Sequence, residues 1–234
     1  MFEASLNMDL FLFAILPYLS MSIFFLMTIH RYRAQSFTYS SLSSQFLENK
    51  AHFWGTVPFH YGILVILAGH VLGFLIPRHL LAWNSRPLRL YVLEVSALIF
   101  GLLSLIGLVN IIIRRVTRSK VRINTTPSDW ILYGMLVIQL ASGVYIAVFY
   151  GWGSSWFAAS ASPYIWSLIK FSPDIGYVVA MPAAVKLHIV SAYMIIAFFP
   201  FTRLVHILVT PNPYLWRKPQ VVRWNSNRAP RRIR

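Results

Sequence analysis

The sequence contains no cysteine and few charged residues. With no cysteine among 234 residues, the chain cannot form a disulfide, hold an iron–sulfur cluster through thiolates, attach a c-type haem covalently or use a cysteine nucleophile. Charged residues make up 12% of the chain and hydrophobic residues 57%, whereas an ordinary soluble domain is about 25% charged. This balance excludes an ordinary soluble domain and predicts a membrane protein.

Long apolar runs predict the architecture. Five runs are each long enough to cross about 30 Å of hydrocarbon as a helix, and they cover residues 8–29, 57–76, 90–113, 130–150 and 177–209. We therefore predict an all-α integral membrane protein, one five-helix bundle over residues 1–234. Pro17 predicts a kink in the first span, because neighbouring helices can satisfy the freed carbonyl. The Gly-, Ser- and aromatic-rich segment 151–176 is expected to form an extracytoplasmic cap on the bundle.

Basic residues dominate the few charges, with 21 Lys and Arg against 6 Asp and Glu. Fifteen of the 21 lie in the first loop, the third loop and the tail 210–234. Because cytoplasmic loops carry the excess of Lys and Arg, this bias predicts the N-terminus outside and the C-terminus in the cytoplasm. The basic residues flank membrane spans, so we expect contacts with membrane lipid and partner proteins, and no nucleic-acid binding.

Four of the seven histidines lie inside predicted spans, where ionisable residues are costly and usually functional. They are His60 and His70 in the second span and His188 and His206 in the fifth. The remaining three, at loops or span ends, are interpreted as interfacial. Neutral imidazole is a strong iron ligand, and a bis-histidine haem needs one imidazole on each face of the porphyrin. Two helices with two histidines each could therefore hold two haems.

The opposite directions of the second and fifth spans pair His70 with His188 and His60 with His206. The spacings agree only loosely, since ten residues of helix rise about 15 Å and eighteen residues about 27 Å. Gly62, Gly69 and Gly73 could let a macrocycle approach the second helix, or simply allow close helix packing. Arg203 could pair with a haem propionate, or extend to the cytoplasmic surface.

Several segments resemble the gamma subunit of respiratory nitrate reductase, a membrane cytochrome b. The similar segments are residues 59–64 (FHYGIL), 68–70 (AGH), 120–122 (KVR), 137–139 (VIQ), 186–188 (KLH), 199–207 (FPFTRLVHI) and 214–218 (YLWRK). Loops and tail agree as well as the spans, so the resemblance covers nearly the whole chain.

The resemblance implies two b haems, a distal one held by His70 and His188 and a proximal one held by His60 and His206. It also implies oxidation of menaquinol or ubiquinol near the distal haem, at Gly69, His70 and Arg89, where Arg89 stands in place of the family's lysine. The implied partners are an iron–sulfur subunit and a molybdenum catalytic subunit that reduces nitrate. The implied location is the prokaryotic inner membrane.

Two other functions remain open at this point. A related dihaem subunit could serve another partner, such as a nitrite-oxidising or heterodisulfide-reducing complex. A haem-free membrane anchor or small transporter could use the histidines as polar sites. Glu94 could relay a quinol proton, although a paired carboxylate at a span end is the simpler interpretation, and Asp129 is expected at a helix N-terminus.

Overall fold

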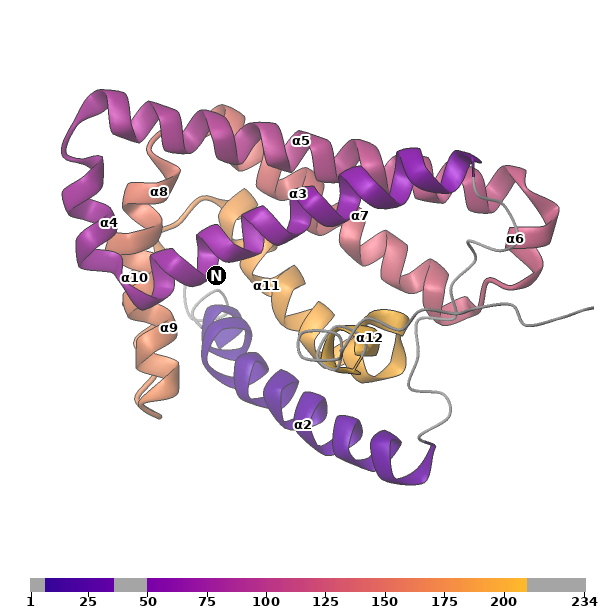
Figure 1. The fold of residues 1–234 in the computed structure, drawn as a ribbon. Helices are drawn as coiled ribbons and strands as arrows, with labels where there is room; N and C mark the ends of the chain where they lie inside the picture. Colours follow the sequence, from indigo (N-terminus) through magenta and orange to yellow (C-terminus); the bar gives the residue numbers. More distant parts are fainter. Residues whose placement is uncertain (1–6, 36–49, 210–234) are drawn as a thin grey trace, which may run out of the picture.

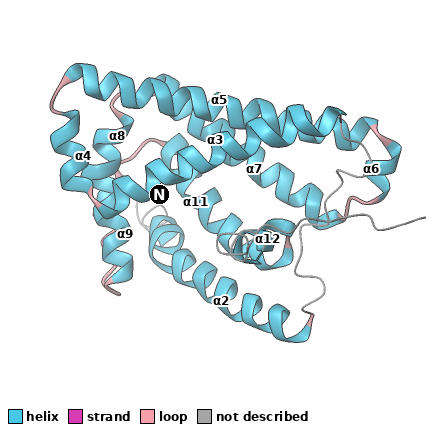
Figure 2. Ribbon diagram, viewed as in Figure 1, coloured by secondary structure: helices cyan, strands magenta, loops and turns pink. Residues whose placement is uncertain are grey.

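The computed structural model describes residues 7–35 and 50–209, and all its regular elements within these ranges are helical (Figures 1 and 2). Five of its helices are long and apolar enough to cross a membrane, as the sequence predicted: Asn7–Ala34, Phe53–Leu75, Pro87–Thr117, Pro127–Phe149 and Ala183–Phe201. They correspond, in order, to α2 (Leu16–Ala34), α3 (Lys50–Leu75), α5 (Pro87–Thr117), α7 (Pro127–Phe149) and α11 (Ala183–Phe198). The chain is therefore a multi-pass membrane protein. Its predicted orientation stays a prediction, and the tail 210–234 lies outside the described residues.

The spanning helices pack in a series: α3 against α5, α5 against α7, α7 against α11, and α11 against α2 (Figure 1). Leucines of α5 and α7 form one buried cluster of this series: Leu108, Leu132, Leu136 and Leu140. Gly62 lies against Ser104 of α5, where a Cβ atom would overlap the serine side chain. Gly62 therefore serves close helix packing, the simpler of its two predicted roles.

Segment 151–176 forms a cap on one end of the bundle, as the sequence predicted. It consists of α8 (Gly153–Trp156), a π-helical turn (Phe157–Ala161) and α9 (Ser162–Ile169), beside α4 (Pro77–Asn84) and α10 (Gly176–Val179) (Figure 1). A second buried cluster ties the cap to the first span through Phe13, Tyr164, Leu168 and Val178. The segment is thus a helical layer packed on the bundle.

Prolines lie within the first two spans, and in each case a side chain from another element donates to the carbonyl four residues before the proline. Pro17 follows a π-helical turn (Phe11–Ile15), and the Tyr164 hydroxyl donates to the Phe13 carbonyl at 2.7 Å. Pro58 lies inside α3, and the side-chain amide of Asn110 donates to the carbonyl of Trp54 at 3.3 Å. A carbonyl without its helical partner is costly in lipid. These contacts satisfy the freed carbonyls, as predicted for Pro17, and the kink at Pro17 stays a prediction.

The fifth span is broken, whereas the sequence predicted one helix over 177–209. α10 ends before Pro182, and α11 begins at Ala183. After α11 the chain makes two short 3₁₀ turns, Phe199–Phe201 and Arg203–Val205, before α12 (His206–Val209) begins. Between the turns, Thr202 is extended, with φ −115° and ψ 177°. Pro182 and Pro200 were visible in the sequence. The predicted rise of about 27 Å assumed an unbroken helix, and that assumption was wrong.

Candidate functional site

The proximal pair, His60 and His206, joins α3 to the first residue of α12. Their ring centroids lie 6.3 Å apart, and their ring planes cross at 60°. The Nδ1 of His60 donates to the carbonyl of Thr56 at 2.8 Å, and the Nδ1 of His206 donates to the carbonyl of Arg203 at 2.7 Å. A carbonyl can only accept, so each ring carries its proton on Nδ1 and leaves Nε2 as a lone-pair donor.

The distal pair, His70 and His188, joins α3 to α11. Their ring centroids lie 6.4 Å apart, and the ring planes are inclined by 33°. The Nδ1 of His70 donates to the carbonyl of Ile66 at 2.9 Å. The Nδ1 of His188 faces α7 instead, where it lies 3.0 Å from the hydroxyl of Ser142 and 3.1 Å from the carbonyl of Gln139. The four histidines therefore meet as the two predicted pairs.

Both separations fit two imidazoles on opposite sides of one iron. A ligating imidazole nitrogen lies about 2 Å from its metal, and the ring centre lies roughly 1 Å further out, so two trans imidazoles have centroids about 6 Å apart. α3 and α11 are not among the closely packed pairs of described helices, although they carry three of these four rings. The two ring separations, 6.3 and 6.4 Å, therefore suit bis-histidine ligation.

The second nitrogen of His188 has a partner of its own. The side-chain amide of Gln139 lies 3.1 Å from His188 Nε2, and the hydroxyl of Ser191 donates to the amide oxygen of Gln139. Ligation by His188 through Nε2 therefore requires this amide to move away from that nitrogen. Gln139 and Ser142 were missed as ligand partners by sequence reasoning, because only the packing of α7 on α11 brings them to His188.

The glycines near the distal pair have different surroundings. A Cβ atom on Gly69 would meet nothing within 4 Å, so the backbone beside His70 is open. On Gly73 it would meet the ring of Phe157 at 2.9 Å, and on Gly143 it would meet His188 Cε1 at 3.0 Å. Gly69 thus leaves room for a flat group beside His70. The missing side chains of Gly73 and Gly143 instead allow close contact with Phe157 of the cap and with the His188 ring.

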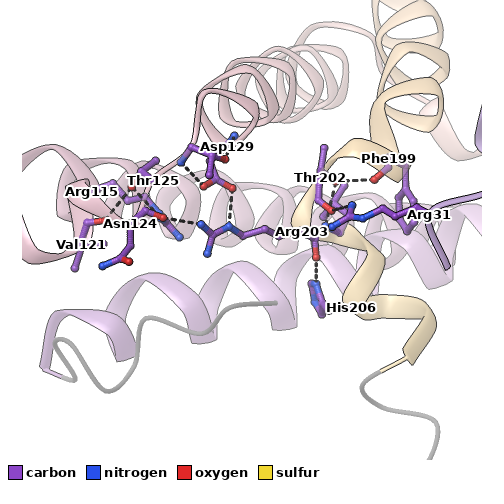
Figure 3. Close-up of polar contacts among 12 residues, drawn as sticks. Arg31, Arg115, Val121, Asn124, Thr125, Asp129, Phe199, Thr202, Arg203 and His206 are labelled. Atoms are coloured by element: carbon purple, nitrogen blue, oxygen red, sulfur yellow. Dashed lines mark hydrogen bonds and ion pairs between the residues drawn. The ribbon is translucent and has the colours of Figure 1, made fainter. Parts of the chain in front are cut away.

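A polar cluster lies beside His206 of the proximal pair (Figure 3). Arg203 Nε lies 2.8 Å from Asp129 Oδ1, and Arg203 Nη2 donates to the carbonyl of Asn124 at 2.6 Å. Asp129 is 3% exposed and also accepts the backbone N–H of Thr126, forming a capping box at the start of α7. Asp129 therefore has the predicted place at a helix N-terminus. Arg203 has protein partners, and its contact with a haem propionate stays a prediction.

Comparison with known proteins identifies the family. A family model described as nitrate reductase gamma subunit matches residues 9–225. The nitrate reductase gamma chain of Bacillus subtilis is 33% identical over 219 residues, covering 92% of this chain and 98% of that protein. The respiratory nitrate reductase 2 gamma chain of Escherichia coli is also 33% identical, over 222 residues, covering 92% and 97%.

The chain belongs to the nitrate reductase gamma subunit family. A more distant likeness extends to one subunit of the dihydromethanophenazine:CoB–CoM heterodisulfide reductase of Methanosarcina barkeri, 33% identical over 126 residues. That match covers 54% of this chain and 42% of the archaeal protein.

Arg89 and Glu94 of this gamma-family chain, the two residues with a predicted part in quinol chemistry, have other contacts. The guanidinium of Arg89 lies over the ring of Trp83, 4.9 Å from its centroid. Among the described residues, no hydrogen bond, ion pair or ring contact joins Arg89 to His70. Glu94 accepts the backbone N–H groups of Trp152 and Ser154, at 3.1 and 3.3 Å. Glu94 is therefore a partnered carboxylate that fixes the beginning of the cap.

Proposed function

We propose that this gamma-family chain is the quinol-oxidising membrane cytochrome b of a respiratory nitrate reductase, and that it passes electrons through two b haems. The chain would oxidise menaquinol or ubiquinol on the outer side of the membrane and deliver electrons to an iron–sulfur subunit on the cytoplasmic side. A molybdenum subunit would reduce nitrate. When bound, each haem would supply a carrier for one electron.

The ring separations of the two histidine pairs carry this proposal. Two pairs at 6.3 and 6.4 Å, drawn from segments far apart in the chain, match the spacing of trans ligands twice. All four Nδ1 atoms lie within hydrogen-bond distance of oxygen atoms, the arrangement that fixes the tautomer and orientation of metal-ligating histidines. A polar role alone would not require this repeated geometry.

Quinol oxidation is assigned to the distal end. Gly69 leaves open space beside His70, and the ring of Phe157 lies edge-on to His70 with centroids 5.3 Å apart. The cap thus gives this end an aromatic wall against which a quinol ring could lie. In this proposal Gly69 and His70 contact the quinol, and Arg89 provides a fixed positive charge at the same end of the bundle.

Haem quantitation tests the proposed function directly. The wild-type chain in its membrane complex should show b-type bands after dithionite reduction, with two haems per chain. His70→Ala should remove the distal haem and His206→Ala the proximal one, because each change deletes one of the two imidazoles that would hold that haem. His79→Ala alters an exposed histidine of α4 and serves as the control. Two haems retained in both ligand variants would contradict the pairing, and an absence of b-type haem in wild type would contradict the function.

A heterodisulfide-type complex is the second candidate, favoured by the likeness to the archaeal heterodisulfide reductase chain. The two candidates differ in their partners, so purification of the intact complex and identification of its other subunits distinguishes them. A molybdenum-containing partner supports nitrate reductase.

A further inference from the structure

Because the fifth span is broken, His206 of the proximal pair is not oriented by a long helix as the other three histidines are. His60, His70 and His188 lie inside long helices, whose preceding turns fix the direction of the side chain. His206 is the first residue of α12 and follows the extended residue Thr202 by only one 3₁₀ turn. Its orientation therefore depends on whatever fixes residues 199–205.

Two arginines hold the segment 199–205 from opposite sides. Arg31 of α2 donates from Nη1 to the carbonyls of Pro200 and Thr202, the latter at 3.0 Å. The Arg203 side chain extends to Asp129 and to the carbonyl of Asn124. Figure 3 shows the Arg31 side chain reaching into this segment and the Arg203 side chain reaching out of it. The break is thus tied to α2 on one side and to the start of α7 on the other.

Arg203 connects these contacts of segment 199–205 to His206. Its guanidinium is fixed by Asp129, and its own carbonyl accepts the Nδ1–H of His206 at 2.7 Å. The Asp129–Arg203 pair is largely buried, with side chains 3% and 18% exposed. Removing one member of a buried ion pair leaves the other charge uncompensated, which is strongly unfavourable. A displaced Arg203 would move the carbonyl that orients the imidazole.

We propose that Asp129 is a positioning residue for the proximal haem. Its carboxylate holds Arg203, and Arg203 in turn sets the orientation of the His206 ring; this inference rests on the proposed dihaem function. The same carboxylate also caps α7, since Oδ2 accepts the N–H of Thr126 while Oδ1 contacts Arg203. The two tasks use different oxygens, so they can be separated by substitution.

Asp129→Asn separates the two tasks. The amide oxygen can still accept the N–H of Thr126, but the amide nitrogen would face another donor, the guanidinium of Arg203. Thr126→Ala is the matched control, because it removes the hydroxyl that accepts the N–H of Asp129 at 3.3 Å and leaves the carboxylate in place. Arg203→Lys is the second test variant. It keeps the charge but lacks the planar guanidinium, whose separate nitrogens contact Asp129 and the Asn124 carbonyl at the same time.

The readouts are low-spin EPR signals and redox titrations of the two haems in the full-length chain within its complex. The ring planes of the two pairs differ in angle, 60° against 33°, so their ferric haems should give separate signals. We expect Asp129→Asn to shift the proximal signal or to reduce it by more than half, and to leave the distal signal unchanged. Arg203→Lys should act in the same direction, and Thr126→Ala should change neither signal.

The distal haem is an internal control for folding. An unchanged proximal signal in Asp129→Asn overturns the positioning role, as does an equal change in Thr126→Ala or an equal change of both haems. If Asp129→Asn does not accumulate in the membrane, Arg203→Lys decides by the same criteria. A wild-type chain without two haems would instead contradict the proposed function, so the two failures are distinguishable.

Discussion

The four paired histidines differ in how their Nδ1 atoms are held. Three of them donate to a backbone carbonyl three or four residues earlier, whereas His188 depends on the Ser142 hydroxyl and the Gln139 carbonyl of α7. The hydroxyl of Ser142 itself donates to the Gln139 carbonyl at 3.0 Å, so its oxygen is oriented to accept from His188. The distal ligand is therefore the one whose basicity can be altered by a side-chain substitution.

Ser142→Ala should raise the midpoint potential of the distal haem. An accepting partner on Nδ1 increases the basicity of a ligating imidazole and so favours the ferric state. The substitution removes one of the two acceptors that face His188 Nδ1 and leaves the Gln139 carbonyl in place. One net hydrogen bond is worth about 1 kcal/mol, which corresponds to roughly 40 mV for a one-electron couple. Potentiometric titration of both haems measures the shift. Ser104→Ala, which removes a hydroxyl bonded to the Phe100 carbonyl, should leave the distal potential unchanged.

The sequence was sufficient to find the four histidines and their pairing. It was insufficient to find the side chains on other helices that hydrogen-bond to them. His60, His70, His188 and His206 stand out because ionisable residues are rare in apolar runs. Gln139 is an ordinary polar residue in a span until α7 is placed against α11, and its contact with His188 depends on the rotation of both helices. Such a tertiary contact has no local signal in the chain.

At the level of elements, polar side chains from neighbouring helices compensate the irregular spans. The carbonyls of Phe13, Trp54 and Pro200 accept from Tyr164, Asn110 and Arg31 in turn. Apolar length predicted the five spans because a membrane helix needs little else. It did not predict the break at Thr202, because a proline in a span bends or breaks the helix according to the partners available for the freed groups.

Tyr164→Phe should destabilise the contact between the cap and the first span. The substitution leaves the buried carbonyl of Phe13 without the hydroxyl that bonds it at 2.7 Å, a loss of about 1–3 kcal/mol. Thermal unfolding in detergent measures the change, with Tyr145→Phe on the exposed face of α7 as the control. Equal melting temperatures for both variants would argue against a stabilising role of this bond.

The same tyrosine predicts a dependence of stability on pH. Burial, and secondarily the neighbouring Tyr193, raises the pKa of Tyr164 above its usual value. A group whose pKa is higher in the folded state stabilises the fold below the unfolded pKa, about 10 for tyrosine, and loses that stabilisation as the pH rises. The difference in melting temperature between wild type and Tyr164→Phe should therefore shrink above about pH 10.

At the scale of the whole molecule, the two histidine pairs lie toward opposite ends of the bundle with different surroundings. Phe157 of the cap contacts His70 of the distal pair. At the other end, Arg203, held by Asp129, contacts His206 of the proximal pair, and Arg31 bonds the segment before His206. The proposed function assigns quinol to the first end and an iron–sulfur partner to the second. This assignment requires that the cap face the outside and the α5–α7 connection face the cytoplasm.

The absence of cysteine permits a direct test of this orientation, because one introduced cysteine is the sole thiol of this chain that a maleimide can label. Ser172→Cys places it on the exposed turn between α9 and α10, and Ser119→Cys places it at the exposed start of α6 (Ser119–Ile123). In intact spheroplasts, a membrane-impermeant maleimide should label Ser172→Cys. It should label Ser119→Cys only after permeabilisation, because residues 114–122, at the end of α5 and after it, carry five of the basic residues that predict the topology. Wild type is the unlabelled control, and the reverse pattern would place the cap in the cytoplasm and exclude quinol oxidation at the outer surface beneath it.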